Sequence, residues 1–295
     1  MGTVIDADVV VGADGSQSSL AAVRVAAAEA VKRGRALRIV HAFIWPLLGV
    51  SAGPPRAGPA GLGLRHTAER LLAEASEEAQ QAVPDVRVTT ELVDGAAAVV
   101  LVHASRSADL LVLGDRGLGG FSGLLLGSVA VQTVEYAACP VLVIRGVERP
   151  GGPVVVGVDG AISASAVEFA VLEASRLGVA LTVVHVGNSP VSAGPEGMPS
   201  SVYDPTVPED EERRVLSGSL AAWVERYPDV DIRPEFVRGH PAHILIERSN
   251  SAQLVVVAAR GRGGFAGLLL GSVSQALIHH AACPVAVTRA APMEA

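Results

Sequence analysis

Short apolar runs alternate along this chain with longer segments of helical period. In the first half the apolar runs cover residues 9–11, 37–40, 110–113 and 141–144, and none of them alternates with polar residues. Such runs are typical of strands buried on both faces, as in parallel sheets. Residues 86–92 do alternate, so we expect that strand nearer an edge of the sheet.

Segments with helical spacing separate these strands. The predicted helices of the first half cover residues 16–32, 65–81, 95–105 and 128–137. Gly34, Pro84 and Pro140 mark the ends of elements. Regular alternation of strand and helix implies right-handed crossovers, with helices on both faces of an open sheet. We therefore predict an α/β fold of doubly wound domains, each a five-stranded parallel sheet of order 3-2-1-4-5.

The second half of the chain repeats the first, which indicates duplication of one whole domain. Matching stretches lie 144 or 145 residues apart, among them "VVVGADGS" with "VVVGVDGA" and "ADLLVLGDRG" with "AQLVVVAARG". The stretch "GVERPGGP" is a Pro/Gly-rich joint between the halves. The predicted organisation is a first domain of residues 1–146, a linker of 147–152 and a second domain of 153–295.

Charge and composition exclude several classes of protein. The net charge of −7 and the pI near 5.6 argue against a broad nucleic-acid-binding surface. No stretch approaches 18 uninterrupted apolar residues, and the first residues do not resemble a signal peptide, so we expect no membrane insertion. Cys139 and Cys283 each precede a proline at equivalent places, which favours two buried, unpaired thiols in a reducing cytoplasm.

A glycine-rich stretch follows the fourth predicted strand of each half. It is "GDRGLGGFSGLLLGSV" at residues 114–129 and "AARGRGGFAGLLLGSV" at 258–273. Because glycine has no Cβ, backbone amides there can approach an anion closely. The inner glycines of the first copy are expected to permit unusual backbone angles: Gly117, Gly119 and Gly120.

The residues around these glycines favour a polyphosphate ligand. Ser128 opens the next predicted helix, where it is expected to cap the helix while its hydroxyl reaches a phosphate. Positive charge is supplied by Arg116 in the first copy and by Arg260 and Arg262 in the second. The stretch is not a P-loop, because G-x-x-x-x-G-K-[ST] is absent from the sequence. It also follows the fourth strand rather than the first, unlike a dinucleotide fingerprint.

An aspartate ends the first strand of each half, Asp14 in "GADGS" and Asp159 in "GVDGA". In the predicted strand order, strands one and four are neighbours and the chain leaves them in opposite directions, which creates a ligand-binding crevice. We therefore expect each aspartate to face the glycine-rich stretch. A carboxylate repels phosphate, so it is better suited to a base amino group or a ribose hydroxyl. The alternative is a helix N-cap or turn residue.

Together these features resemble the ATP-binding motif class of the universal stress protein family. The family pattern is G-x2-G-x9-G-[ST] after the fourth strand, with an aspartate after the first. The first half fits it at every position, and the second half fits it except at Ala258, which replaces the leading glycine. The resemblance implies that ATP is bound, with Mg²⁺ held through the phosphates. It also implies a homodimer formed through the fifth strand and a role in stress or dormancy responses.

The predicted nucleotide-binding residues follow from this resemblance and from the charges noted above. In the first half they are Ala13, Asp14, Ala42, Gly114, Arg116, Gly117, Gly127, Ser128 and Val129. In the second half they are Val158, Asp159, Val186, Ala258, Arg260, Gly261, Gly271, Ser272 and Val273. If Ala258 needs a positive φ, it costs about 1 kcal/mol or more relative to glycine. If its φ is negative, its methyl group only narrows the ribose pocket. We predict that the second site binds more weakly.

Three functions are compatible with these residues. The first is a nucleotide-binding regulator, because no general base, nucleophile or repeated metal cluster is evident. The second is a slow ATP hydrolase or phosphotransferase in which the aspartate holds Mg²⁺ or activates water. The third is an adaptor for protein partners that are not identified, in which nucleotide only stabilises the fold.

Other motifs carry less weight. "GVSAG" at 49–53 fits the pattern G-x-S-x-G but lies in a Pro-rich segment rather than a strand-to-helix elbow, so no catalytic residue is assigned. His41 and His185 recur at the end of the second strand of each half. We favour packing or turn roles for both and keep ligand contact as the alternative. Segments 45–63 and 187–205 are expected to be long functional or mobile loops.

Overall fold

The computed structural model describes residues 7–43, 60–118, 126–159, 163–187, 209–261 and 269–289. The chain forms two compact units, Met1–Ile144 and Arg145–Ala295. Gly119, Gly120, Arg262, residues 49–53 and most of the segments 45–63 and 187–205 lie outside the described residues.

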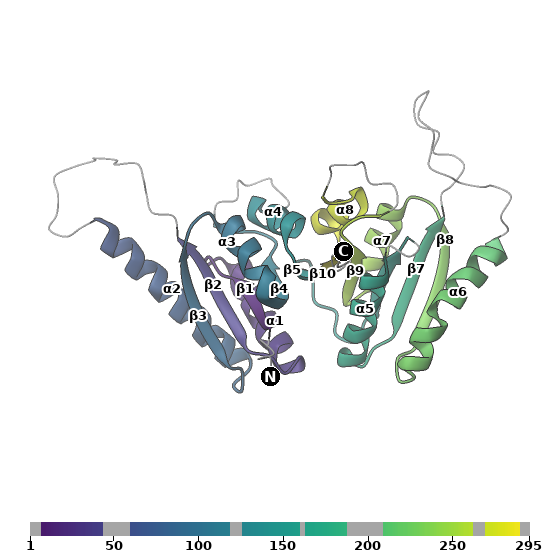
Figure 1. The fold of residues 1–295 in the computed structure, drawn as a ribbon, viewed down its shortest axis with the longest axis horizontal. Coiled ribbons are helices and arrows are strands. Elements are labelled where there is room, and N and C mark those ends of the chain that lie inside the picture. Colours follow the sequence, from purple (N-terminus) through teal and green to yellow (C-terminus); the bar gives the residue numbers. More distant parts are fainter. Residues whose placement is uncertain are drawn as a thin grey trace, which may run out of the picture. The chain divides into compact units, whose positions relative to one another are not determined.

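The first unit is a five-stranded sheet. Its strands are β1 (Asp8–Gly12), β2 (Leu37–Phe43), β3 (Val88–Asp94), β4 (Ala108–Gly114) and β5 (Val141–Ile144). Its helices are α1 (Gln17–Lys32), α2 (Ala60–Ala82), α3 (Ala97–Ala104) and α4 (Ser128–Tyr136), with a 3₁₀ turn at Ser105–Ser107. The strand order is β3-β2-β1-β4-β5 and every pair is parallel, which confirms the predicted topology (Figure 1).

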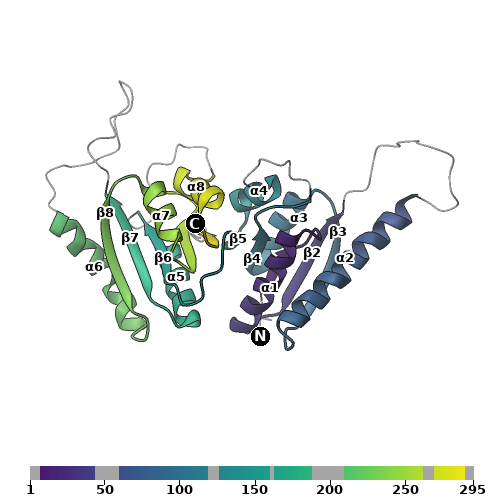
Figure 2. The same cartoon turned by 180° about the vertical axis from the view of Figure 1, so that it is seen from behind.

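The second unit repeats this arrangement. Its strands are β6 (Val154–Val158), β7 (Leu181–Gly187), β8 (Ile232–Arg238), β9 (Leu254–Ala258) and β10 (Val285–Thr288). Its helices are α5 (Ala164–Leu177), α6 (Glu209–Arg226), α7 (Pro241–Ser249) and α8 (Ser272–His280). The order β8-β7-β6-β9-β10 is again parallel throughout, and helices cover both faces of each sheet (Figures 1 and 2).

Small side chains let the helices lie close to the sheet. Val9, Val10 and Val11 of β1 are fully buried, and so are Ala22 and Ala26 of α1, which lie on one face because they are four residues apart. β3 has no fully buried residue and lies at an edge of the sheet, where its sequence pattern predicts it. The continuous apolar runs at β1, β2 and β4 became inner strands, whereas the run at β5 lies at the other edge of the five-stranded sheet.

The boundaries of several helices differ from the prediction. α2 begins at Ala60 rather than at residue 65, and α3 begins at Ala97 rather than at 95. Gly95 has a φ of +147°, which is incompatible with a helical residue. α1 begins at Gln17 because Ser16 is its N-cap, with the side chain accepting a hydrogen bond from Ser19 N–H.

Both cysteines are buried and unpaired, as predicted. Burial raises the pKa of the Cys139 thiol to about 12 and that of Cys283 to about 11, so neither is a reactive thiolate at neutral pH. Within the described residues, no helix is both long enough and apolar enough to span a membrane.

Candidate functional site

A pocket of about 370 Å³ opens at the carboxyl ends of β1 and β4 in the first unit. These strands are neighbours, and the chain leaves them toward opposite faces of the sheet, which is the switch point where doubly wound folds bind ligands. All nine residues predicted for the first half line this pocket. Residues from β2 and α3 complete the lining: Val40, His41, Ala97 and Leu101. The pocket is thus built from four segments that are distant in sequence.

Asp14 bridges the β1–α1 turn and the glycine-rich loop. Its Oδ1 accepts a hydrogen bond from Ser16 N–H at 3.0 Å, and its Oδ2 accepts one from Leu118 N–H at 2.9 Å. Burial raises the pKa of this carboxyl, but the hydrogen bonds from Ser16, Leu118 and Ser19 outweigh it and lower the pKa below its usual 3.8. Asp14 is therefore ionised at neutral pH, and it is both the turn residue and the residue facing the loop.

Gly117 is needed because the Asp14 carboxylate lies close to its backbone. The expectation that Gly117 has an unusual backbone angle was wrong. Gly117 is not among the glycines with positive φ. A Cβ at Gly117 would lie 2.5 Å from Asp14 Oδ2, nearer than any side chain tolerates. A Cβ at Gly261 would lie 2.9 Å from Asp159 Oδ2. In both units the aspartate carboxylate therefore occupies the space that a side chain would need.

The first turn of α1 is fastened to the loop after β4. Ser18 Oγ donates a hydrogen bond to Asp115 Oδ1 at 2.7 Å and accepts one from Arg116 N–H at 3.3 Å. A Cβ at Gly114 would lie 2.7 Å from the backbone carbon of Ser18. Gly114 is therefore required by the contact between α1 and the end of β4, a role that the sequence did not reveal.

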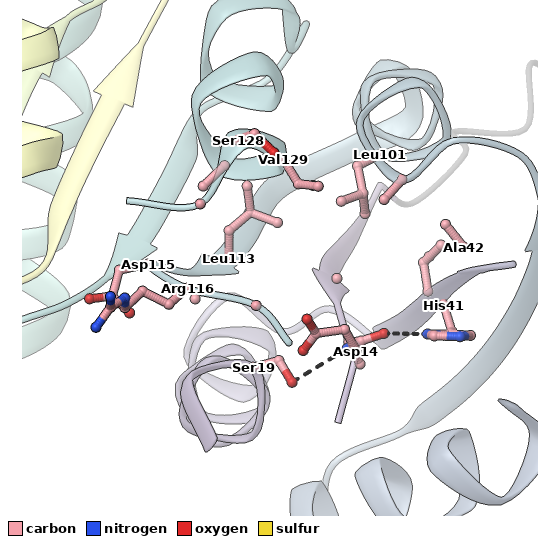
Figure 3. Close-up of a pocket in the computed structure, with 18 of the residues that line it drawn as sticks. Asp14, Ser19, His41, Ala42, Leu101, Leu113, Asp115, Arg116, Ser128 and Val129 are labelled. Atoms are coloured by element: carbon pink, nitrogen blue, oxygen red, sulfur yellow. Dashed lines mark hydrogen bonds between the residues drawn. The ribbon is translucent and has the colours of Figure 1, made fainter. Parts of the chain in front are cut away.

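The α4 N-terminus forms the anion-attracting side of the pocket. The first four N–H groups of a helix have no partner within it, and the helix dipole favours negative charge there. The N-cap of α4 is Gly127, without a side-chain capping bond, so the prediction that Ser128 caps the helix was wrong. Ser128 is the exposed first helical residue and lines the pocket, across from Asp14 (Figure 3). Arg116 is exposed at the same rim.

On the apolar side of the pocket, Ala42 was predicted from the sequence but Val40 and Leu101 were not. Leu101 of α3 lies so close to β1 that a Cβ at Gly12 would be 3.0 Å from its side chain. Val40 and Ala42, which alternate with His41 along β2, also line the pocket. The available signal was topological: in this fold the helix after the third strand packs across the carboxyl ends of the central strands.

The predicted residues of the second unit lie at equivalent positions. Val158 is the last residue of β6 and Asp159 follows it, while Val186 lies in β7. Ala258 is the last residue of β9, and Arg260 and Gly261 lie just after it. Gly271 is the N-cap of α8, whose first two residues are Ser272 and Val273. Ala258 pairs with Thr288 in the β9–β10 ladder, so it has extended backbone. The alternative in which Ala258 needs a positive φ is therefore excluded.

The turn after the first strand differs in length between the two units. Asp14 and Ser19 are five residues apart, whereas Asp159 and the equivalent Ser163 are four apart. The segment that contains Ser18 in the first unit is therefore one residue shorter in the second.

These features define a doubly wound α/β protein with an acidic group and a helix N-terminus on opposite sides of one pocket at the carboxyl ends of its central strands. The chain matches the universal stress protein family twice, at residues 7–145 and 152–289. It is 38% identical to a universal stress protein of Mycolicibacterium smegmatis, over 95% of this chain and 96% of that one. It is 39% identical to universal stress protein Rv2005c of Mycobacterium tuberculosis, with the same coverage. The chain belongs to the universal stress protein family, as its motifs predicted.

A solved structure shares the complete fold. A crystal structure of a universal stress protein from Archaeoglobus fulgidus matches with a TM-score of 0.71 and 20% identity, covering 98% of this chain and 99% of that one. At this identity the match concerns the fold, which in both proteins extends over the whole chain.

Proposed function

We propose that the chain is an ATP-binding regulatory protein with one nucleotide site in each unit. The observation that carries this proposal is the pocket between Asp14 and the α4 N-terminus, which has opposite electrostatic character at its two ends. Its volume lies within the range of small-molecule sites. A nucleotide has the same polarity, with an uncharged base and ribose at one end and phosphates at the other.

The polarity of the pocket sets the direction of the nucleotide. The ionised Asp14 repels phosphates and accepts hydrogen bonds from ribose hydroxyls or a base amino group. Ser128, Arg116 and the first-turn amides of α4 receive the phosphates. Val40 and Leu101 offer apolar contact to the base.

Mg²⁺ fits this proposal only as a partner of the phosphates. Among the described residues, no three His, Cys, Asp or Glu side chains are arranged to hold a metal ion. When bound, Mg²⁺ would neutralise phosphate charge, and the chain's contribution would be to orient the nucleotide that carries it.

The second site is proposed to be narrower. Four alanine or glycine positions that line the first pocket carry more carbon atoms in the second unit: Ala13 is replaced by Val158, Ala42 by Val186, Ala97 by Pro241 and Gly114 by Ala258. Each adds carbon atoms next to the place proposed for base or ribose. The second site should therefore bind the same nucleotide more weakly.

The nucleotide carried by the protein distinguishes this function from its alternative. Freshly purified protein is denatured, and the released small molecules are separated by chromatography. Intact ATP supports the regulator, whereas ADP alone supports the slow hydrolase or phosphotransferase. Release of neither nucleotide, together with no ATP binding in calorimetry, would refute both. The low pKa of Asp14 makes it a weak general base, which favours the regulator.

Three further properties are proposed with this function: a homodimer formed through an edge strand, a cytoplasmic location, and domain boundaries at residues 146 and 153. Sedimentation equilibrium tests the dimer. Limited proteolysis tests the boundaries, since cleavage within 147–152 should release two stable fragments.

A further inference from the structure

The peptide group between Ala13 and Asp14 is held at both of its polar ends by side chains. The Ala13 carbonyl accepts a hydrogen bond from His41 Nδ1–H at 2.7 Å. Asp14 N–H donates to Ser19 Oγ at 3.4 Å. Figure 3 shows the two contacts on either side of Asp14. We call His41 and Ser19 the peptide clamp.

The second unit has the same clamp on the equivalent peptide. His185 Nδ1–H donates to the Val158 carbonyl at 3.1 Å, and Asp159 N–H donates to Ser163 Oγ at 2.7 Å. The serine contact is preserved even though the segment between aspartate and serine is one residue shorter. Both serines are buried. The two copies therefore kept these contacts while the loop around them changed.

The peptide clamp lies at the end of β1, where the backbone pairing between β1 and β2 ends. The last β1–β2 pair is Gly12 with Val40, so the Ala13 carbonyl lies just beyond the ladder. His41 is the next residue of β2, and its ring supplies the hydrogen bond that a further pair would have made. A carbonyl only accepts hydrogen bonds, so Nδ1 carries the proton.

Fixing this peptide restricts the residue that follows it. Rotation of the Ala13–Asp14 peptide is coupled to the φ angle of Asp14, and φ sets the direction in which the carboxylate leaves the backbone. With the peptide held, the carboxylate oxygens lie 3.0 Å from Ser16 N and 2.9 Å from Leu118 N. Without the clamp, the Ala13–Asp14 peptide could rotate, and the Asp14 carboxylate would move away from Ser16 N–H and Leu118 N–H.

We propose that His41 and Ser19, and equally His185 and Ser163, are positioning residues that set the direction of the aspartate carboxylate and thereby the affinity of each site for nucleotide. The effect on affinity rests on the proposed function. The effect on the carboxylate does not, and it is measurable without nucleotide.

The test compares two substitutions of His41. His41→Asn keeps an N–H donor near the position of Nδ1, whereas His41→Leu removes the donor and keeps an apolar side chain. The pKa of the Asp14 carboxyl is first measured by carbon-13 NMR without nucleotide. It should rise in His41→Leu and Ser19→Ala, because the hydrogen bonds that lower it are misaligned, and stay near the wild-type value in His41→Asn.

Affinity is then measured by calorimetry with ATP as the probe, in the full chain carrying Asp159→Ala to silence the second site. His41→Leu should weaken binding about tenfold, the loss expected for one hydrogen bond to a charged group, and His41→Asn should stay within about threefold. In an Asp14→Ala background, His41→Leu should have no further effect.

Three results would refute the positioning role of His41. The first is an unchanged Asp14 pKa in folded His41→Leu, and the second is an equal loss of ATP affinity in His41→Leu and His41→Asn. The third is a full additional loss of ATP affinity when His41→Leu is made in the Asp14→Ala background. Thermal unfolding identifies a variant that has failed to fold, and Ser19→Ala then repeats the test from the other side of the peptide. If the Asp14 pKa responds as expected but the wild-type chain binds no ATP, the proposed function fails and the clamp remains.

Discussion

Two glycines of one loop are required for different reasons, and substitution by alanine separates them. Gly117 is exposed and faces the Asp14 carboxylate, whereas Gly114 lies against the backbone of Ser18. The first contact belongs to the pocket and the second to the packing of α1. A single glycine-rich motif therefore contains a residue needed for binding and a residue needed for stability.

Gly117→Ala should impair binding and leave stability nearly unchanged. The new methyl group would displace Asp14 Oδ2 and break its hydrogen bond with Leu118 N–H. We expect ATP affinity at the first site to fall by about tenfold or more, with a change of under about 0.5 kcal/mol in the free energy of unfolding. Calorimetry and denaturant unfolding measure the two effects. Unchanged affinity would contradict the assignment.

Gly114→Ala should mainly destabilise the first unit. Its Cβ would meet backbone atoms of Ser18, which cannot rotate away as a side chain can. The expected loss is about 1–3 kcal/mol of unfolding free energy, typical of overpacking. The matched control is Gly218→Ala in α6, where a Cβ meets nothing within 4 Å, and alanine should stabilise the helix by about 1 kcal/mol. Similar effects of the two substitutions would refute this account.

At the scale of whole elements, the sequence predicted more of the fold than of the contacts between elements. Continuous apolar runs identified the inner strands β1, β2 and β4, and the alternating sequence of β3 identified one edge, whereas the apolar run of β5 did not reveal that it lies at the other edge of the five-stranded sheet. The contact of Ser18 with Gly114 joins residues that are about a hundred positions apart, and local sequence carries no trace of it. The same is true of Leu101, which reaches the pocket only because α3 crosses the sheet.

The C-terminal end of α1 contains a buried charge that makes stability depend on pH. Glu29 accepts hydrogen bonds from Lys32 Nζ at 3.0 Å and from Arg33 Nε at 3.2 Å. Burial raises the pKa of Glu29, but the two cations outweigh it, so the folded-state pKa lies below the usual 4.5. A carboxyl with a lowered pKa stabilises the fold above its unfolded pKa, and this contribution is lost as pH falls through the folded value.

Glu29→Gln should therefore destabilise the first unit at pH 7 by about 1–3 kcal/mol, because the buried Arg33 loses a carboxylate partner while it keeps its ion pair with Asp109. The difference from wild type should shrink as the pH falls below about 4.5, where the wild-type carboxyl also becomes neutral. Thermal unfolding followed between pH 7 and pH 3 measures this convergence. A constant difference over that range would show that Glu29 acts by packing and not by charge.

At the scale of the whole chain, duplication has produced two units with the same aspartate, clamp and glycine contact but different side chains at positions that line the first pocket. The conserved parts, Asp14 with Asp159 and His41 with His185, lie at strand ends, where the sheet fixes them. The changed parts line the proposed base and ribose region, where an added methyl group alters fit without disturbing the fold. Under the proposed function, this division allows the two units to differ in affinity for nucleotide.

The two affinities can be measured separately in the full chain. Asp159→Ala leaves the first site and Asp14→Ala leaves the second, each titrated with ATP by calorimetry. We expect the second site to bind about tenfold more weakly, because extra carbon atoms in a formed pocket cost about 1–3 kcal/mol. Equal affinities would refute the proposed asymmetry.

A substitution in the second unit tests the cause of that difference. Ala258→Gly restores the leading glycine of the motif, and because Ala258 has extended backbone, the change removes a methyl group without relieving a strained φ angle. Affinity at the second site should rise by a few-fold while the unfolding free energy falls slightly, since glycine is less favourable in a strand. If Ala258→Gly leaves the affinity unchanged, the difference must come from other positions, of which Val158, Val186 and Pro241 carry added carbon atoms. Val186→Ala, which copies the first unit at one further position, then tests whether Val186 is responsible.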